Sequence, residues 1–263
     1  MTMGSCHQVV PRLITFDVTG TLLMTKIKQH YVEVALSCGY VGQLDGPRLE
    51  KTFRKSFKRL EVEHPIYGRH TGLGWERWWR TLVHEVFQDQ DRGIDKSKLE
   101  QIASGLIDCY SSKHCWHKYP GTLELLDSLH GRRDLVLGVV SNFDERLGIV
   151  LDSTGLRSYF AFVLTSYGFG IQKPSPAIFQ EALRLASLGL SREIRPEEAV
   201  HVGDRLDNDF LGARGAGWNA VLIDRDGKNE EDQRLGSRDV VVDFRGLKEY
   251  FDRLFDKKAV CDR

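Results

Sequence analysis

Five polar side chains capable of chemistry follow apolar segments at widely separated places in the chain. They are Asp17, Ser141, Lys173, Asp204 and Asp209. A carboxylate can act as a nucleophile, a hydroxyl and an ammonium group can bind an anion, and paired carboxylates can hold a divalent cation. Any one of them alone indicates little, because Asp is common in turns and caps. Together they predict a single site that combines a nucleophile, anion-binding groups and cation ligands.

The chain between these residues alternates between strand-like apolar runs and segments of helical period. The expected strands begin within residues 12–23, 134–144, 160–167, 199–209, 219–227 and 239–244. The expected helices lie within residues 121–131, 175–189 and 207–217. We expect Asp207 or Asn208 near the N-cap of the last helix. This alternation predicts an α/β fold with a Rossmann-like, mostly parallel sheet covered on both faces, and ligands of such sheets bind beyond the carboxyl ends of the strands.

Residues 25–118 differ from the rest because they contain long amphipathic patterns and no convincing strand. The three Trp residues of segment 75–87 share one helical stripe, which indicates core packing more than a ligand platform. A helical insertion directly after the first strand predicts two domains. The core domain comprises residues 1–24 and 119–263, and the helical cap domain comprises residues 25–118.

The bulk composition is that of an ordinary globular protein with balanced charge. Lys+Arg and Asp+Glu each total 37 residues, which argues against a nucleic-acid binder and against a protein that binds anionic membranes. We find neither a signal-peptide pattern nor an apolar run long enough to span a membrane. The five cysteines are scattered and odd in number, so we expect no disulfide scaffold and a cytoplasmic location. The oligomeric state is not readable from the sequence.

The same residues, taken as motifs, resemble those of the haloacid dehalogenase superfamily. Asp17-Val18-Thr19-Gly20-Thr21 resembles its first motif, Ser141 in VVSN the second, Lys173-Pro174 the third, and Gly203-Asp204 through Asp209 the acidic fourth. The resemblance covers essentially the whole chain, with the helical segment at the place of a C1-type cap. The stretches SNFDERL and KPSPAIFQEALRLA are similar to a subgroup that includes haloacid dehalogenase-like hydrolase domain-containing protein 3 and the insect rhythmically expressed gene 2 proteins.

The resemblance implies a Mg²⁺-dependent hydrolase that forms an aspartyl-phosphate on Asp17 from a small phosphorylated molecule. It implies that the carboxylates of Asp17 and Asp204 and the backbone carbonyl of Thr19 hold the ion. Asp209 would hold the metal through a water or orient one of its ligands.

The remaining motif residues are expected to bind the phosphoryl group. Lys173 would supply a positive charge beside the carboxylates, and Ser141 would donate a hydrogen bond to a phosphoryl oxygen. Thr21 belongs to a turn whose N–H groups would cradle the same oxygens, and Gly20 permits the close approach. Asn142 is expected either to bond the substrate or to cap its own turn.

Position 19 departs from the pattern of typical phosphatases of this superfamily, which carry there a second Asp that protonates the leaving group and then activates water. This chain has Thr19, whose hydroxyl cannot act as a general base at neutral pH. General acid–base catalysis contributes roughly 10²- to 10⁴-fold, so we expect slow turnover. The DVTGT sequence is similar to the D-K-T-G-T motif of P-type ATPases, which favours covalent capture over rapid hydrolysis.

Three functions are compatible with these residues. The first is a slow phosphatase or phosphotransferase. The second is a non-catalytic protein that binds Mg²⁺ or a phosphorylated ligand, which Thr19 alone supports. The third is a dehalogenase that attacks carbon, and the Asp204/Asp209 pair argues against it because that chemistry needs no metal. The presence of Asp17, Ser141 and Lys173 favours the first function over the second.

Other candidates are weaker. His114, Cys115 and His117 lie close together, but a zinc site usually needs four ligands, and no second pair is near in sequence. Lys58 belongs to a lysine repeat that we expect on a solvated helix face. The Gly-rich loop of residues 67–74 is expected to be a turn, although it could reach over the pocket.

Overall fold

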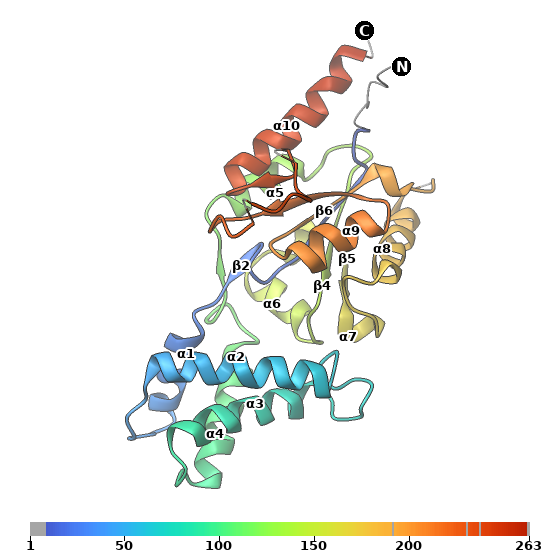
Figure 1. Cartoon of the computed structure of the whole chain (residues 1–263). Helices are drawn as coiled ribbons and strands as arrows, with labels where there is room; N and C mark the ends of the chain where they lie inside the picture. The colour runs from blue at the N-terminus through green and yellow to red at the C-terminus, as the bar shows by residue number, and fades with distance from the viewer. Residues whose placement is uncertain (1–8, 191, 230, 237, 262–263) are drawn as a thin grey trace.

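A parallel sheet forms the centre of the molecule (Figure 1). The computed structural model describes residues 9–190, 192–229, 231–236 and 238–261. Within them the sheet has six strands in the order β5-β4-β1-β6-β7-β8, and every neighbouring pair is parallel. The strands are β1 (Leu13–Phe16), β4 (Val136–Ser141), β5 (Phe162–Thr165), β6 (Ala199–Gly203), β7 (Asn219–Ile223) and β8 (Val240–Val241). Each predicted strand segment contains one of them, and the predicted α/β class is confirmed.

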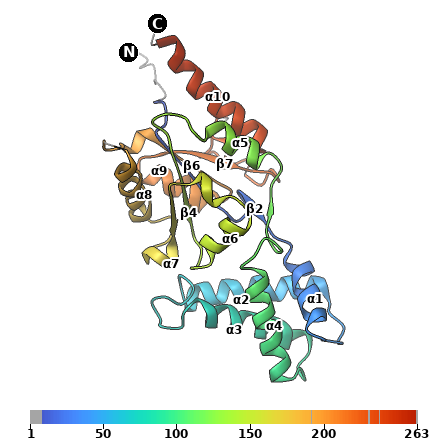
Figure 2. The ribbon, with the colours of Figure 1, turned by 180° about the vertical axis from the view of Figure 1, so that it is seen from behind.

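Helices cover both faces of this sheet because alternate residues of a strand point to opposite sides. Ile14 of β1 belongs to one apolar cluster, whereas its neighbour Leu13 belongs to the other. The first face carries α5 (Thr122–Leu129), α6 (Leu147–Ser153) and α10 (Phe244–Cys261). The second face carries α8 (Pro176–Gly189), the π-helical turn η3 (Leu206–Leu211) and α9 (Gly212–Gly215). Figures 1 and 2 show α5 with α10 on one side of the sheet and α8 with α9 on the other.

The helical segment after β6 begins earlier than the sequence predicts. Arg205 occupies the N-cap position of η3, so Asp207 and Asn208 lie within the first turn instead of at the cap. The remaining short elements are η1 (Arg157–Tyr159), α7 (Ser166–Phe169) and η2 (Pro196–Glu198).

Four helices between the first strand and the rest of the sheet form a layer of their own, which we call the helical layer. They are α1 (Ile27–Ser37), α2 (Gly46–Glu63), α3 (Trp75–Gln90) and α4 (Lys96–Cys109). Two of these helices begin at an Asp N-cap. The Asp45 side chain accepts from the N–H of Arg48 at the start of α2, and the Asp95 side chain accepts from N–H groups at the start of α4. The helical layer has its own apolar cluster and lies beyond one end of the sheet (Figure 1).

Two short antiparallel strands connect the helical layer to the sheet. They are β2 (Leu23–Met24) and β3 (His117–Lys118). The expectation of no strand within residues 25–118 is therefore wrong at its last two residues. The domain boundaries themselves stay a prediction, and residues 1–8 and 262–263 of the predicted core lie outside the described residues.

The cysteines differ from the expectation in one respect. A disulfide joins Cys109, the last residue of α4, to Cys115, two residues before β3. It ties the end of the helical layer to the returning chain, and it occupies the sulfur of the Cys115 that lies between His114 and His117. No helix in the described part of the chain is sufficiently long and apolar to cross a membrane.

Candidate active site

The carboxyl ends of neighbouring strands bring the predicted residues together. Asp17 follows β1, Ser141 ends β4 and Asp204 follows β6, and these three strands are neighbours in the sheet. Asp17 is 7% exposed, and the Ser141 hydroxyl donates to its Oδ1 over 2.9 Å. The sequence prediction that these residues share one edge of the sheet agrees with this arrangement.

Lys173 is the positive centre of the site. Its side chain is 2% exposed, and its Nζ lies 2.9 Å from Asp17 Oδ1, 2.6 Å from Asp209 Oδ1 and 2.8 Å from the Val140 carbonyl oxygen. Burial alone would lower the pKa of Lys173, but the two carboxylates outweigh burial and raise it. Lys173 is therefore charged at neutral pH and holds Asp17 and Asp209 in place.

Asp209 is fixed by contacts on both of its oxygens. Its Oδ2 accepts from the Arg205 N–H over 2.9 Å, and its Oδ1 lies 3.3 Å from His201 Nε2. The other ring nitrogen of His201 is 2.8 Å from the Thr15 hydroxyl. Burial would raise the pKa of Asp209, but Lys173 and His201 outweigh it and hold the pKa well below its usual range. Sequence reasoning missed His201 and Thr15 because both lie inside strands.

Asp204 is the carboxylate with the least support from the protein. Burial and the nearby charges of Asp17 and Asp209 raise the pKa of Asp204 to about 7. The Thr21 hydroxyl donates to its Oδ1 over 3.3 Å. Gly20, at φ 84°, packs so closely on Asp204 that a Cβ at position 20 would collide with the carboxylate. The site thus concentrates negative charge beside a turn that only glycine accommodates.

The three carboxylates fit a hard divalent cation. Asp17, Asp204 and Asp209 each offer an oxygen, and these oxygens lie within 4.8 Å of one another. Mg²⁺ prefers oxygen ligands and commonly takes only one or two from carboxylates. A cation would offset the repulsion that raises the pKa of Asp204. The donor set and its electrostatics therefore suit Mg²⁺.

A cavity of about 650 Å³ lies between these carboxylates and the helical layer. Its lining includes Asp17, Thr19, Ser141, Lys173 and Asp209 together with side chains of α1, α2 and α3. The volume falls within the usual range of small-molecule sites, roughly 300 to 1,000 Å³. Thr19 is exposed to this cavity, in the place where the resemblance expects an acid or base.

Two predicted phosphate contacts have other partners in this structure. Thr21 is fully buried, its N–H donates to the Val18 carbonyl oxygen over 3.3 Å, and its hydroxyl orients Asp204. The Asn142 side chain bonds the backbone of Lys173 reciprocally, with Oδ1 accepting from the N–H over 2.8 Å and Nδ2 donating to the carbonyl oxygen over 3.0 Å. Asn142 therefore sets the position from which Lys173 enters the site, although it also lines the cavity.

The turn after β1 is supported by a residue that the motifs do not include. Arg225 donates to the carbonyl oxygens of Gly20 and Thr21, and its guanidinium lies 3.6 Å from the ring centroid of Tyr119. No signal in the sequence pointed to Arg225, because it lies 205 positions from Gly20.

The helical layer contacts the loop that follows Ser141. The Trp79 indole donates to Asp144 Oδ2 over 2.7 Å, and Asp144 is also paired with Arg146. The Tyr67 hydroxyl donates to the Asn142 carbonyl oxygen over 2.9 Å. Trp78 is core, as expected, but Trp79 lines the cavity, so the core-packing interpretation of the Trp stripe holds for only part of it.

The Gly-rich loop and the lysine repeat also have defined places. His70 Nε2 of the loop lies 2.8 Å from the Gly170 carbonyl oxygen, so the loop reaches the segment before Lys173. Lys58 is exposed, as expected, but it lines the cavity.

Comparison with known proteins adds the family. A family model described as haloacid dehalogenase-like hydrolase matches residues 11–217. The rhythmically expressed gene 2 protein of Drosophila melanogaster is 36% identical over 221 residues, which cover 81% of this chain and 82% of that protein. The human haloacid dehalogenase-like hydrolase domain-containing protein 3 is 36% identical over 220 residues, which cover 82% of this chain and 83% of that protein.

Two solved structures are similar over most of the chain. A 2-haloacid dehalogenase from Pseudomonas syringae has a TM-score of 0.62 and 26% identity, covering 93% of this chain and 99% of that one. A HAD phosphatase from Thermococcus onnurineus has a TM-score of 0.55 and 25% identity, covering 90% and 96%. The resemblance expected from the motifs, including its subgroup, is confirmed. The chain belongs to the haloacid dehalogenase-like hydrolase family.

Proposed function

We propose that this hydrolase is a Mg²⁺-dependent phosphatase or phosphotransferase that forms an aspartyl-phosphate on Asp17 and turns over slowly. One observation carries the proposal: Asp17 lines a substrate-sized cavity and is held there by Ser141 and Lys173 beside two further carboxylates. This is the arrangement that in-line attack on phosphorus requires, because a nucleophile, a counter-charge and cation ligands converge at one point.

The residues divide the work as follows. Ser141 and Lys173 both bond Asp17 Oδ1, which leaves Oδ2 without a hydrogen bond among the described residues and free to attack. Asp17, Asp204 and the Thr19 carbonyl oxygen would hold Mg²⁺. Asp209 would hold the ion through a water or orient one of these ligands. When bound, the ion would neutralise phosphoryl charge and make the phosphorus more electrophilic.

Thr19 is the reason to expect slow turnover. After transfer, water must attack the phosphorus of the aspartyl-phosphate, and the side chain at position 19 is a hydroxyl instead of a carboxylate. The helical layer would act as the cap, excluding water during transfer and admitting it afterwards. The proposed partner is a small phosphorylated molecule, and the proposal includes no binding to nucleic acids or membranes. The cytoplasmic location also stays a proposal.

Two alternatives have specific support. Thr19 alone favours a protein that binds Mg²⁺ or a phosphorylated ligand without turnover. The solved structure described as a 2-haloacid dehalogenase, at 26% identity, favours attack on carbon. The acidic cluster argues against the dehalogenase, because that chemistry has no use for a cation site.

A three-variant experiment with 4-nitrophenyl phosphate tests the proposal. Thr19→Asp should raise the Mg²⁺-dependent kcat by roughly 10²- to 10⁴-fold, and Asp17→Asn should abolish turnover in either background. Asp207→Asn is the matched control, because Asp207 is exposed and lies two residues from Asp209 outside the triad. If Asp17→Asn and its parent are equally inert even with Asp at position 19, the proposal of a phosphatase is wrong and the non-catalytic binding function is favoured.

Calorimetry tests the metal separately from activity. We expect Mg²⁺ to bind the wild-type protein and the Asp207→Asn variant equally, and Asp204→Asn to weaken binding at least tenfold. Equal affinities in all three proteins would contradict the metal assignment.

A further inference from the structure

The part of the cavity opposite Asp17 is walled by aromatic side chains. Phe53 and Phe57 of α2, Trp79 of α3 and Tyr110 after α4 line it, and each is partly exposed. Partly exposed rings that face one cavity favour a flat apolar ligand, because such a ligand gains stacking and edge contacts.

Tyr31 adds one polar atom to this apolar wall. It lines the cavity, its side chain is only 2% exposed, and its hydroxyl has no hydrogen-bond partner among the residues that the structure describes. The ring is fixed by stacking on Phe87, at 6.0 Å between centroids, and by an edge contact with Phe53 at 5.7 Å. Because Tyr31 lines the cavity, its hydroxyl is available to bond a ligand atom or a water.

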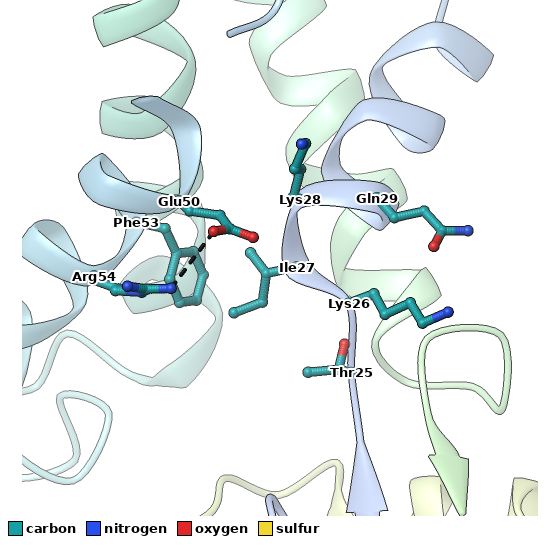
Figure 3. Close-up of a pocket in the computed structure, with 8 residues that line it drawn as sticks. All are labelled: Thr25, Lys26, Ile27, Lys28, Gln29, Glu50, Phe53 and Arg54. Carbon is teal, nitrogen blue, oxygen red and sulfur yellow. Dashed lines mark ion pairs between the residues drawn. The ribbon is translucent and has the colours of Figure 1, made fainter. Parts of the chain in front are cut away.

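A neighbouring cavity continues the wall between α1 and α2. A smaller cavity of about 510 Å³ opens between α1 and α2, and it shares Thr25, Ile27, Phe53 and Arg54 with the larger one. Figure 3 shows Ile27 and Phe53 facing each other across it while Lys28 points away. Arg54 is turned toward Glu50, with 3.6 Å between the charged groups. The shared lining is thus mixed, with the apolar side chains of Ile27 and Phe53 beside Thr25 and an ion-paired Arg54.

Thr19 restricts the leaving group independently of the cavity wall. Without an acid at position 19, the leaving oxygen departs as an anion. A phenol such as the Tyr side chain has a pKa of about 10, whereas water, the nearest reference for an aliphatic alcohol, has about 15.7. A phenolate therefore leaves readily where an alkoxide does not. The wall and the missing acid point to the same ligand.

We propose that the substrate is an aryl phosphate, that is, a phosphate ester of a phenol, whose ring lies against Phe53, Phe57 and Trp79 and whose ring substituent bonds Tyr31. This inference rests on the proposed phosphatase function and specifies its substrate class. In the first step an oxygen of Asp17 forms a bond to phosphorus, and the bond from phosphorus to the phenolic oxygen breaks, with the electron pair leaving on the phenolate. In the second step a water oxygen bonds to phosphorus, the bond to Asp17 breaks, and the water's protons pass to phosphate and solvent.

Three phosphate esters and one acyl phosphate separate ring recognition from leaving-group quality. Phenyl phosphate has a ring and a good leaving group, benzyl phosphate a ring and a poor one, acetyl phosphate no ring and a good one, and ethyl phosphate neither. The value of kcat/KM reports transfer to Asp17, whereas kcat on a rapidly reacting ester reports the attack of water. Phosphate release is measured for all four compounds with the wild-type protein and with Thr19→Asp.

The leaving-group half of the proposal is tested by the effect of Thr19→Asp. We expect kcat/KM to rise at least 100-fold for benzyl phosphate and less than tenfold for phenyl phosphate, since only benzyl phosphate needs the acid. If the wild-type protein transfers from benzyl phosphate as fast as from phenyl phosphate, this half is wrong.

Glu61 provides a check on the same half, because it is the carboxylate of α2 that lines the cavity. If the leaving group needs no acid, Glu61→Gln leaves kcat/KM for phenyl phosphate within twofold. A loss of tenfold or more would mean that the helical layer supplies the proton, and would overturn the leaving-group argument.

The ring half is tested where leaving groups are matched. In the Thr19→Asp protein, benzyl phosphate should exceed ethyl phosphate at least tenfold in kcat/KM, and Phe57→Ala should remove most of that preference. Equal values for the two esters would overturn ring recognition. Should Asp17→Asn match its parent on all four compounds, the phosphatase function itself is wrong, which is a result distinct from the loss of ring recognition.

Tyr31→Phe tests the polar contact. The loss of one hydrogen bond is worth roughly three- to tenfold. We therefore expect KM for 3- or 4-hydroxyphenyl phosphate to rise by that factor more than KM for phenyl phosphate. Equal changes for the substituted and unsubstituted esters would contradict the assignment of Tyr31.

Discussion

The two halves of the cavity are built by different physics. On the sheet side, Lys173, Asp17 and Asp209 are buried and joined by hydrogen bonds of 2.6 to 2.9 Å. On the side of the helical layer, rings such as Phe53 and Phe57 pack at 6.0 Å between centroids. Ion pairs and directional hydrogen bonds define the sheet side, whereas the packing of rings defines the side of the helical layer. Chemistry therefore depends on individual atoms at the sheet edge, whereas selectivity depends on how four helices pack.

The largest effect should follow from removing the positive centre of the sheet side. Lys173→Met leaves Asp17 and Asp209 buried without their counter-charge, and breaking a buried ion pair costs about 3 to 5 kcal/mol. Urea denaturation in the presence of a chelator measures the free energy of unfolding. The exposed cavity lysine serves as control: Lys58→Met should change it by less than about 0.5 kcal/mol. Similar values for the two variants would remove the distinction between the halves.

Crowding of the Asp204 carboxylate should give the next largest effect. Gly20→Ala introduces left-handed strain, roughly 1 to 2 kcal/mol, and a collision with Asp204 that adds about 1 to 3 kcal/mol. Gly155→Ala is matched in strain, at φ 73°, but its Cβ would meet nothing within 4 Å. Thermal unfolding should therefore separate the two variants, and only Gly20→Ala should also weaken Mg²⁺ binding. Equal destabilisation would show that the turn has room.

Contacts between the halves should matter less. Trp79→Phe removes a donor from the buried Asp144, which keeps its pairing with Arg146, so we expect a loss of about 1 to 2 kcal/mol. Trp75→Phe removes a comparable 3.0 Å bond to the exposed Glu145 and should cost less than about 0.5 kcal/mol. Chemical denaturation of both variants checks this, and the reverse order would mean that Asp144 is satisfied without the helical layer.

The smallest effect should be local. Tyr67→Phe loses one neutral hydrogen bond to the Asn142 carbonyl oxygen, worth about 1 kcal/mol, or roughly fivefold in an opening equilibrium. Hydrogen exchange should speed up by that factor in residues 142–146. Tyr40→Phe, whose 3.4 Å bond to Asp91 stays within the helical layer, should leave this segment unchanged. If both variants accelerate exchange there, the two halves are coupled through more than the Tyr67 contact.

The same contrast explains how much the sequence could predict. Asp17, Ser141 and Asp204 could be placed together because each follows an apolar run, and parallel strands end at a shared edge. The wall of the cavity could not be predicted in this way. Trp78 and Trp79 are adjacent on one stripe, yet the first is fully buried and the second lines the cavity. The rotation of a helix against its neighbours decides such a difference, and it depends on long-range packing.

Polar contacts between distant segments were equally out of reach. The motif predicts that the turn of Thr21 cradles phosphate through its N–H groups, but nothing in it indicates that the Thr21 hydroxyl bonds a carboxylate 183 positions away. The disulfide between Cys109 and Cys115 was missed because an odd number of scattered cysteines gives no pairing signal. Arg225 and His201 carry no motif at all and act only through the fold.

The position of β1 has a consequence for how the protein is made. This first strand lies between β4 and β6, so its partners are synthesised more than 100 residues later. The hydrogen-bond partners of Asp17 are also synthesised late: Ser141 follows it by 124 positions and Lys173 by 156 positions. Closing such long loops slows folding, so recovery of Asp17 reactivity during refolding would report when the sheet is complete. A nascent chain that ends before β6 would offer its central strand only one of its two partners, β4.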